Sequence, residues 1–179
     1  MGRDFRRILT GLGLLFSMVP LAWAVTGMVA VQIDLSRAGT SPDGLRRARQ
    51  TALDMESTLM DRLFDDGHIA FNAPSEIHQP DAAEPLTAIE NLLSRTRYGG
   101  GSLLFFCQIR LSEPAPGKAL SVDSCSVSLV PTYVASGFPQ TLNLPVNPAM
   151  PDSDLKAAMA RIAATLMARV ATVPPPVPG

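Results

Sequence analysis

The sequence predicts an α+β fold, a two-layer sandwich in which three helices pack on a mixed sheet of four or five strands. Two periodicities support this class: some segments alternate apolar and polar residues, and others repeat apolar residues every three or four positions. Proline and glycine separate these segments, so the element order reads β-α-β-α-β-β-(β)-α. The first β-α-β unit predicts a parallel strand pair, and the later β-β unit predicts an antiparallel hairpin.

The first strand is expected over residues 27–35. Every second side chain there is strongly apolar, which gives the strand one core-facing side: Val29, Val31, Ile33 and Leu35. The opposite side is weaker, because Met28 and Ala30 are followed by two polar residues. We therefore place the helices on one face of the sheet.

The longest helix is expected over residues 42–66. Ser41 is a suitable N-cap, and Pro42 fits the first helical position. An apolar stripe with helical spacing follows: Leu45, Ala48, Ala52, Met55, Leu59 and Leu63. Gly67 supplies the stop. A short strand over residues 68–71 and a loop come next.

A second helix is expected to begin at Pro85 and to end at the three glycines that follow Tyr98. Two strands, residues 102–111 and 120–130, then flank a loop rich in proline and glycine. Because they are consecutive and close in sequence, these strands should form the hairpin.

Residues 140–146 are expected to form a further strand at an edge of the sheet, since Pro145 disfavours a central position. The third helix should span residues 151–170, where apolar residues again recur at helical spacing. Residues 173–179 are rich in proline and lack core residues, which predicts a disordered tail.

The N-terminus has the features of an export signal. Three arginines lie within the first seven residues, an uncharged apolar stretch follows, and Ala22-Trp23-Ala24 gives a small-x-small cleavage pattern. We therefore expect residues 1–24 to be a cleaved signal peptide and residues 25–172 to be a single domain. The mature protein should then be periplasmic or secreted.

An uncleaved membrane anchor is the alternative interpretation. No charged residue occurs between Ile8 and Ile33, and this stretch is long enough to span a bilayer. Residues 8–30 would then hold the protein at the membrane. Cleavage is favoured because the first strand of the mature domain accounts for the extra apolar length.

The layout resembles that of small cell-envelope modules. A long capped helix ending at Gly67 before a strand, and a second helix passing through "RYGGGSLLFFCQI" into an apolar strand, are similar to the N-terminal domain of TolB and to the lipoprotein activators of penicillin-binding proteins. The resemblance covers residues 27–130. The chain departs from the lipoproteins because no cysteine lies near the cleavage site. The resemblance implies a non-enzymatic, protein-binding role and transfers no functional residue.

We assign no catalytic, cofactor-binding or metal-binding residue. The only histidines, His68 and His78, lie in different elements without ligand spacing. No G-x-S-x-G segment occurs, and the glycines after Tyr98 end a helix where a phosphate loop would open one. A net charge of −1 and 6% aromatic residues disfavour nucleic acid as a partner.

The cysteines, Cys107 and Cys125, occupy the two strands of the predicted hairpin. The register that sets them opposite each other also sets Phe105 opposite Val127, so that all four side chains share one apolar face. Export would bring the pair into an oxidising compartment. We therefore expect a structural disulfide, worth about 3 kcal/mol.

The function expected from these observations is that of a non-catalytic protein-interaction module of the cell envelope, with an envelope protein as its partner. Arg46, Arg47 and Arg49, on the polar side of the long helix, form a candidate partner surface. The alternative is a small-ligand or lipid-binding periplasmic carrier. In that case Leu104 and Phe106 would line a pocket on the second face of the sheet, provided that no helix covers it.

Overall fold

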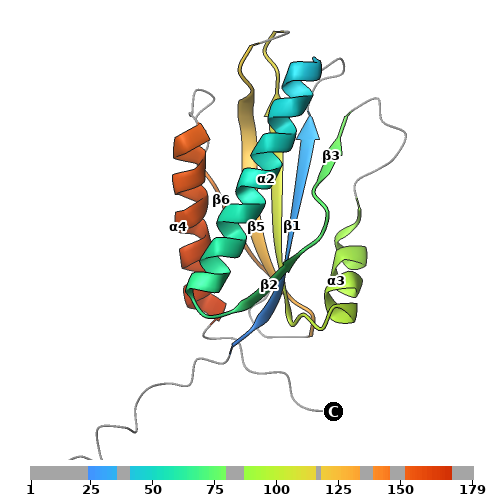
Figure 1. The fold of residues 1–179 in the computed structure, drawn as a ribbon, viewed down its shortest axis with the longest axis vertical. Coiled ribbons are helices and arrows are strands. Elements are labelled where there is room, and N and C mark those ends of the chain that lie inside the picture. Colours follow the sequence, from blue (N-terminus) through green and yellow to red (C-terminus); the bar gives the residue numbers. More distant parts are fainter. Residues whose placement is uncertain are drawn as a thin grey trace, which may run out of the picture.

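The computed structural model describes residues 24–35, 41–79, 87–115, 118–133, 139–145 and 152–170, which form a mixed sheet flanked by helices (Figure 1). The elements in chain order are β1 (Thr26–Leu35), α2 (Pro42–Asp65), β2 (Ile69–Asn72), β3 (Glu76–His78), α3 (Ile89–Tyr98), β4 (Leu103–Ser112), β5 (Ser121–Pro131), β6 (Gln140–Asn143) and α4 (Asp152–Val170). The predicted α+β class is confirmed. The short strand β3 was not expected.

Strand β1 lies inside the sheet, whose strand order is β2-β1-β4-β5-β6 with β3 also paired to β1. Strands β2, β3 and β4 all run parallel to β1, which confirms the predicted parallel unit. Strands β4 and β5 form the predicted antiparallel hairpin, and β6 extends it as an edge strand. The polypeptide thus joins a parallel half and an antiparallel half through β4.

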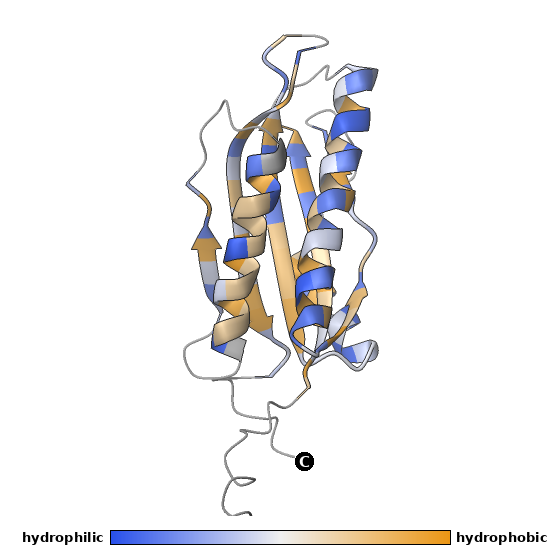
Figure 2. Cartoon of the chain, turned by 60° about the vertical axis from the view of Figure 1, so that its left-hand side comes forward, coloured by the Kyte–Doolittle hydropathy of each residue, from blue (hydrophilic) through white to orange (hydrophobic). Residues whose placement is uncertain are grey.

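Helices α2 and α4 cover one face of the sheet side by side (Figure 1). The predicted cap is present, since the hydroxyl of Ser41 accepts a hydrogen bond from the backbone N–H of Gly44. Gly67 ends the helix with a φ of 78°, a left-handed conformation that glycine adopts without strain. Figure 2 shows hydrophobic central strands behind these helices and hydrophilic residues on the outer side of α2. The main core lies between the two layers.

Helix α3 lies on the opposite face of the sheet, which differs from the expected placement of all helices on one side. A second apolar cluster explains this position, and its buried members are Met28, Ala30, Ala73, Leu92, Leu104 and Phe106. Leu104 and Phe106 are therefore covered by α3, with exposed fractions of 0% and 5%. The pocket that the alternative carrier function would require at these two residues is therefore filled by the protein itself.

The predicted signal peptide up to Trp23 and the tail at residues 173–179 lie outside the described residues. Residues 26–30, which the alternative anchor includes, belong to strand β1. Within the described part of the chain, no helix is both long enough and apolar enough to cross a membrane.

A buried carboxylate joins the end of the hairpin to the start of α2. Glu113 accepts hydrogen bonds from the backbone N–H and the hydroxyl of Ser41, both at 2.7 Å. Arg47 approaches the same carboxylate at 3.3 Å, and the Glu113 side chain is only 4% exposed. Because Ser41 caps the helix, this contact fixes where α2 begins relative to the sheet.

We predict that Glu113→Gln lowers the free energy of unfolding by about 2 kcal/mol, because the variant loses charge-assisted hydrogen bonds in a buried site. Urea denaturation of the two proteins measures the difference. Asp65→Asn, at an exposed position near the end of α2, is the matched control and should change stability by less than about 0.5 kcal/mol. Equal losses in the two variants would contradict the structural role of Glu113.

Candidate functional site

A groove of about 490 Å³ lies between helix α2 and the edge of the sheet formed by β2 and β3. We call it the edge groove, and its lining residues are Arg49, Ala52, Leu53, Glu56, Asn72, Pro74, Ser75 and Ile77. Ala52 is buried, whereas Leu53 is 55% exposed. The groove therefore presents an apolar surface to solvent beside a small number of polar groups, as binding clefts do.

The polar groups of the edge groove are held by contacts between α2 and the strands. Glu56 accepts hydrogen bonds from Asn72 Nδ2 at 2.6 Å and from Ser75 Oγ at 2.7 Å. The Glu56 carboxylate is thus engaged by donors of its own chain. Arg49 forms no salt bridge with any described residue, so its guanidinium is the charged group of the groove that an incoming molecule can pair with.

The edge groove runs beside an edge of the sheet to which no other described strand is paired. Ile69 and Ala73 donate their backbone N–H groups to Val25 and Val29, on the β1 side. Successive residues of a strand direct their backbone groups to opposite edges. Ala70 and Asn72 therefore direct their N–H and C=O groups away from β1, where a further strand can pair with them.

The other partly buried glutamates also serve the fold. Glu76 accepts hydrogen bonds from the backbone N–H and hydroxyl of Thr87, at 2.8 and 2.6 Å, and from Gln32 Nε2 at 3.2 Å. Glu76 thus connects β3 to the residues just before α3, as Glu113 connects the end of β4 to the cap of α2. Glu56 connects α2 to the end of β2 and to the residues after it.

Among the described residues, no group of three or more histidine, cysteine, aspartate or glutamate side chains is placed to hold a metal ion.

The three arginines of the candidate partner surface do not gather at one place. Arg46 pairs with Asp43 at 3.3 Å on the exposed side of α2. Arg47 turns toward Glu113 and also donates to the backbone carbonyl of Lys118 at 2.6 Å. Arg49 alone lines the edge groove. The partner surface therefore stays a prediction, with Arg49 as the member that the geometry favours.

His68 contacts the start of β1. Its Nδ1 accepts a hydrogen bond from the backbone N–H of Val25 at 3.2 Å, which requires an unprotonated Nδ1. Partial burial lowers the pKa of His68, and the Asp66 carboxylate opposes this effect more weakly. The neutral imidazole is therefore the form that the folded state favours.

The expected opposition of Cys107 and Cys125 is wrong by two residues. Cys107 faces Val127, and Cys125 faces Ile109, so the two cysteines are diagonal neighbours across the hairpin. Diagonal positions are about 7–8 Å apart between Cα atoms, beyond the usual span of a disulfide. Both cysteines are free thiols in the structure. The expected disulfide is absent, and the two cysteine side chains pack in the core.

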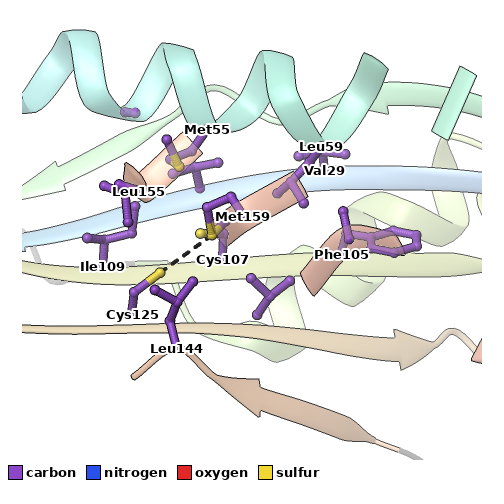
Figure 3. Packing of buried hydrophobic residues seen from close by; sticks show 14 of the residues in the cluster. Val29, Met55, Leu59, Phe105, Cys107, Ile109, Cys125, Leu144, Leu155 and Met159 are labelled. Atoms are coloured by element: carbon purple, nitrogen blue, oxygen red, sulfur yellow. Dashed lines mark hydrogen bonds between the residues drawn. The ribbon is translucent and has the colours of Figure 1, made fainter. Parts of the chain in front are cut away.

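The thiols lie in the centre of the main core (Figure 3). The Cys125 sulfur is 3.6 Å from the Met159 sulfur of α4, and both cysteines are almost completely buried. A hydrogen bond with the Cys125 thiol, together with burial, raises the pKa of Cys107. Neither thiol is accessible to solvent or to a substrate, which gives this pair a packing role.

Sequence reasoning missed half of the edge groove, because residues 72–77 were expected to form a loop. The hydrogen bonds of Glu56 to Asn72 and Ser75 join residues 16 and 19 positions apart, and no local sequence pattern predicts such contacts. The alternation of polar Glu76, apolar Ile77 and polar His78 was a usable signal for β3, although three residues are few for a periodicity argument.

Comparison with known proteins gives only low similarity. No protein-family model matches the chain, and no curated protein sequence matches it. The PelC dodecamer from Paraburkholderia phytofirmans is 15% identical, with a TM-score of 0.39, covering 81% of this chain and 90% of that one. Lipoprotein GNA1162 from Neisseria meningitidis is 13% identical, with a TM-score of 0.38, covering 80% and 96%. Likenesses of this size assign neither family nor function.

We predict that both cysteines are reduced in the purified protein. Unfolding the full chain without reductant and adding N-ethylmaleimide should give a mass increase of two adducts, whereas the folded protein should react slowly because both thiols are buried. A denatured chain that takes up the reagent only after prior reduction would instead show that a disulfide forms.

We also predict a histidine-dependent loss of stability in acid. The pKa of His68 is lower in the folded state than its unfolded value of about 6.5, so the unfolded chain binds the proton first. The stability contribution is complete above about pH 6.5 and is lost as the pH falls through the folded pKa. Urea midpoints measured between about pH 8 and pH 5 report it.

His68→Gln is the matched variant, because glutamine keeps an acceptor for the Val25 N–H without titrating. The variant should show a smaller decrease in urea midpoint over this pH interval than the wild-type protein. Identical pH profiles for the two proteins would contradict the assignment.

Proposed function

We propose that this chain is an exported cell-envelope protein that acts as a non-catalytic protein-interaction module. The observation that carries the proposal is the edge groove. It combines the half-exposed Leu53, the guanidinium of Arg49 and an adjacent strand edge to which no other described strand is paired. Surfaces of this kind suit a polypeptide partner, which offers both side chains and backbone hydrogen-bonding groups.

The use of the polar side chains supports a binding role over catalysis. Glu56, Glu76 and Glu113 accept hydrogen bonds from groups that hold the fold together. The two thiols are buried in the core. Acid–base or nucleophilic chemistry requires such groups to face a substrate. The carrier alternative loses its expected site, because α3 covers Leu104 and Phe106.

Export is supported by the position of the first strand. The Ala22-Trp23-Ala24 pattern ends one residue before Val25, whose carbonyl accepts the N–H of Ile69 at 3.0 Å. Cleavage after Ala24 would therefore leave β1 complete. An N-terminal sequence that begins at Val25 in exported protein tests this part of the proposal, and an intact Met1 would overturn it.

Photocrosslinking in the producing cells tests the interaction role directly. A photoreactive amino acid placed at Leu53 should form adducts with an envelope protein, because this side chain lies in the edge groove. The same amino acid at Phe64, which is 51% exposed on the same helix but does not line the groove, is the control. We predict several-fold more adduct at Leu53. Equal labelling at the two positions, or none at either, would contradict the proposal.

A further inference from the structure

We propose that the edge groove binds an extended peptide segment that carries an acidic residue two positions from an apolar residue. The segment would add to the sheet as a strand beside β2 and would direct these two side chains toward Arg49 and Leu53 of α2. This inference rests on the proposed interaction function and names the partner's chemistry. Three features of the described residues carry it: the strand edge, the spacing of Arg49 and Leu53, and the charge of the groove.

The strand edge favours an extended ligand. Among the described strands, β2 is paired to β1 alone, and Ala70 and Asn72 direct their backbone groups to the other side. A helix or a compact ligand would leave these groups without a backbone partner, whereas a peptide strand satisfies them. Asn72, the last residue of β2, lines the edge groove together with Arg49 and Leu53 of α2. A strand that pairs with β2 and continues past Asn72 toward β3 would therefore place alternate side chains in the edge groove.

The spacing of the two helical side chains matches that of a strand. Arg49 and Leu53 are four residues apart on α2, which is a rise of about 6 Å along the helix axis. Side chains on one face of a strand recur every second residue, about 6.6 Å apart. An apolar residue and an acidic residue separated by one position can therefore reach Leu53 and Arg49 at the same time.

The charge of the edge groove selects an acidic side chain. Its two charged residues are Arg49 and Glu56, and the Glu56 carboxylate is held by Asn72 and Ser75 at 2.6 and 2.7 Å. Arg49 is therefore the charged residue of the edge groove that is available to a ligand. Its guanidinium can bind a carboxylate through two parallel hydrogen bonds. Arg46, one turn earlier, is already paired with Asp43 and adds little to the selection.

Selection from a phage-displayed library of random heptapeptides on the immobilised full chain tests the inference. We expect enrichment of peptides with an apolar and an acidic residue at relative positions one and three, in either direction. A fluorescently labelled copy of an enriched peptide should bind about tenfold or more weakly to Arg49→Ala and to Leu53→Ser. Arg46→Ala and Phe64→Ser, on the same helix outside the groove, are the controls and should bind normally.

Backbone methylation of the peptide tests the strand geometry separately. Methyl groups on the alternate nitrogens that face β2 should abolish binding, and methyl groups on the other nitrogens should be tolerated. Peptides without the apolar–acidic pattern, equal binding by Arg49→Ala and wild type, or no enrichment at all would each overturn the inference. A lower mass in solution for Leu53→Ser than for the wild-type protein would also overturn the inference. It would show that a second copy of the chain occupies the edge groove.

The outcomes also separate this inference from the proposed function. Adducts at Leu53 in cells, combined with peptide binding that does not depend on Arg49, would leave the interaction function in place and remove the acidic-strand partner. Absence of adducts, together with absence of any selected peptide, would remove both.

Discussion

The parallel pairing of strand β1 is the constraint on which the rest of the structure depends. Strand β1 is buried on both faces over most of its length and is paired on both sides, to β4 over nine residue pairs and to β2 and β3 on its other side. One face of β1 packs in the main core beneath α2, and the other packs in the cluster beneath α3. Because β4 pairs with one side of β1, β2 and β3 pair with its other side and lie at the edge of the sheet. The edge groove lies between this edge and α2.

Local signals in the sequence were sufficient for most of the elements. The cap at Ser41, the stop at Gly67 and the stripe of α2 are properties of neighbouring residues, and each is present. The hairpin register was not predictable in this way. A shift of two residues keeps every side chain on the same face, so an apolar pattern supports both the expected register and the observed one. Packing against Met159 and the bulge after Arg110 belong to the tertiary structure.

The candidate site was less accessible from the sequence than the fold. Arg49 was named for its charge, but its difference from Arg46 and Arg47 depends on Asp43 and Glu113, which are brought near by helix geometry and by the hairpin. The placement of α3 had a visible cue, because Met28 and Ala30 precede the polar Gln32 and Asp34 on the same face of β1. A ten-residue helix is about 15 Å long, which suits the apolar part of this face alone.

The addition of a partner strand to β2 requires that the backbone groups at the outer edge of β2 form no strand hydrogen bonds in the free protein and form them in the complex. Hydrogen–deuterium exchange of the full chain, alone and with the bound partner or selected peptide, measures this most directly. The amides of Ala70 and Asn72 should exchange quickly in the free chain, whereas those of Ile69 and Ala73, bonded to β1, should exchange slowly. Binding should slow Ala70 and Asn72 specifically. Unchanged exchange at these two amides, with protection appearing elsewhere on the molecule, would contradict the account.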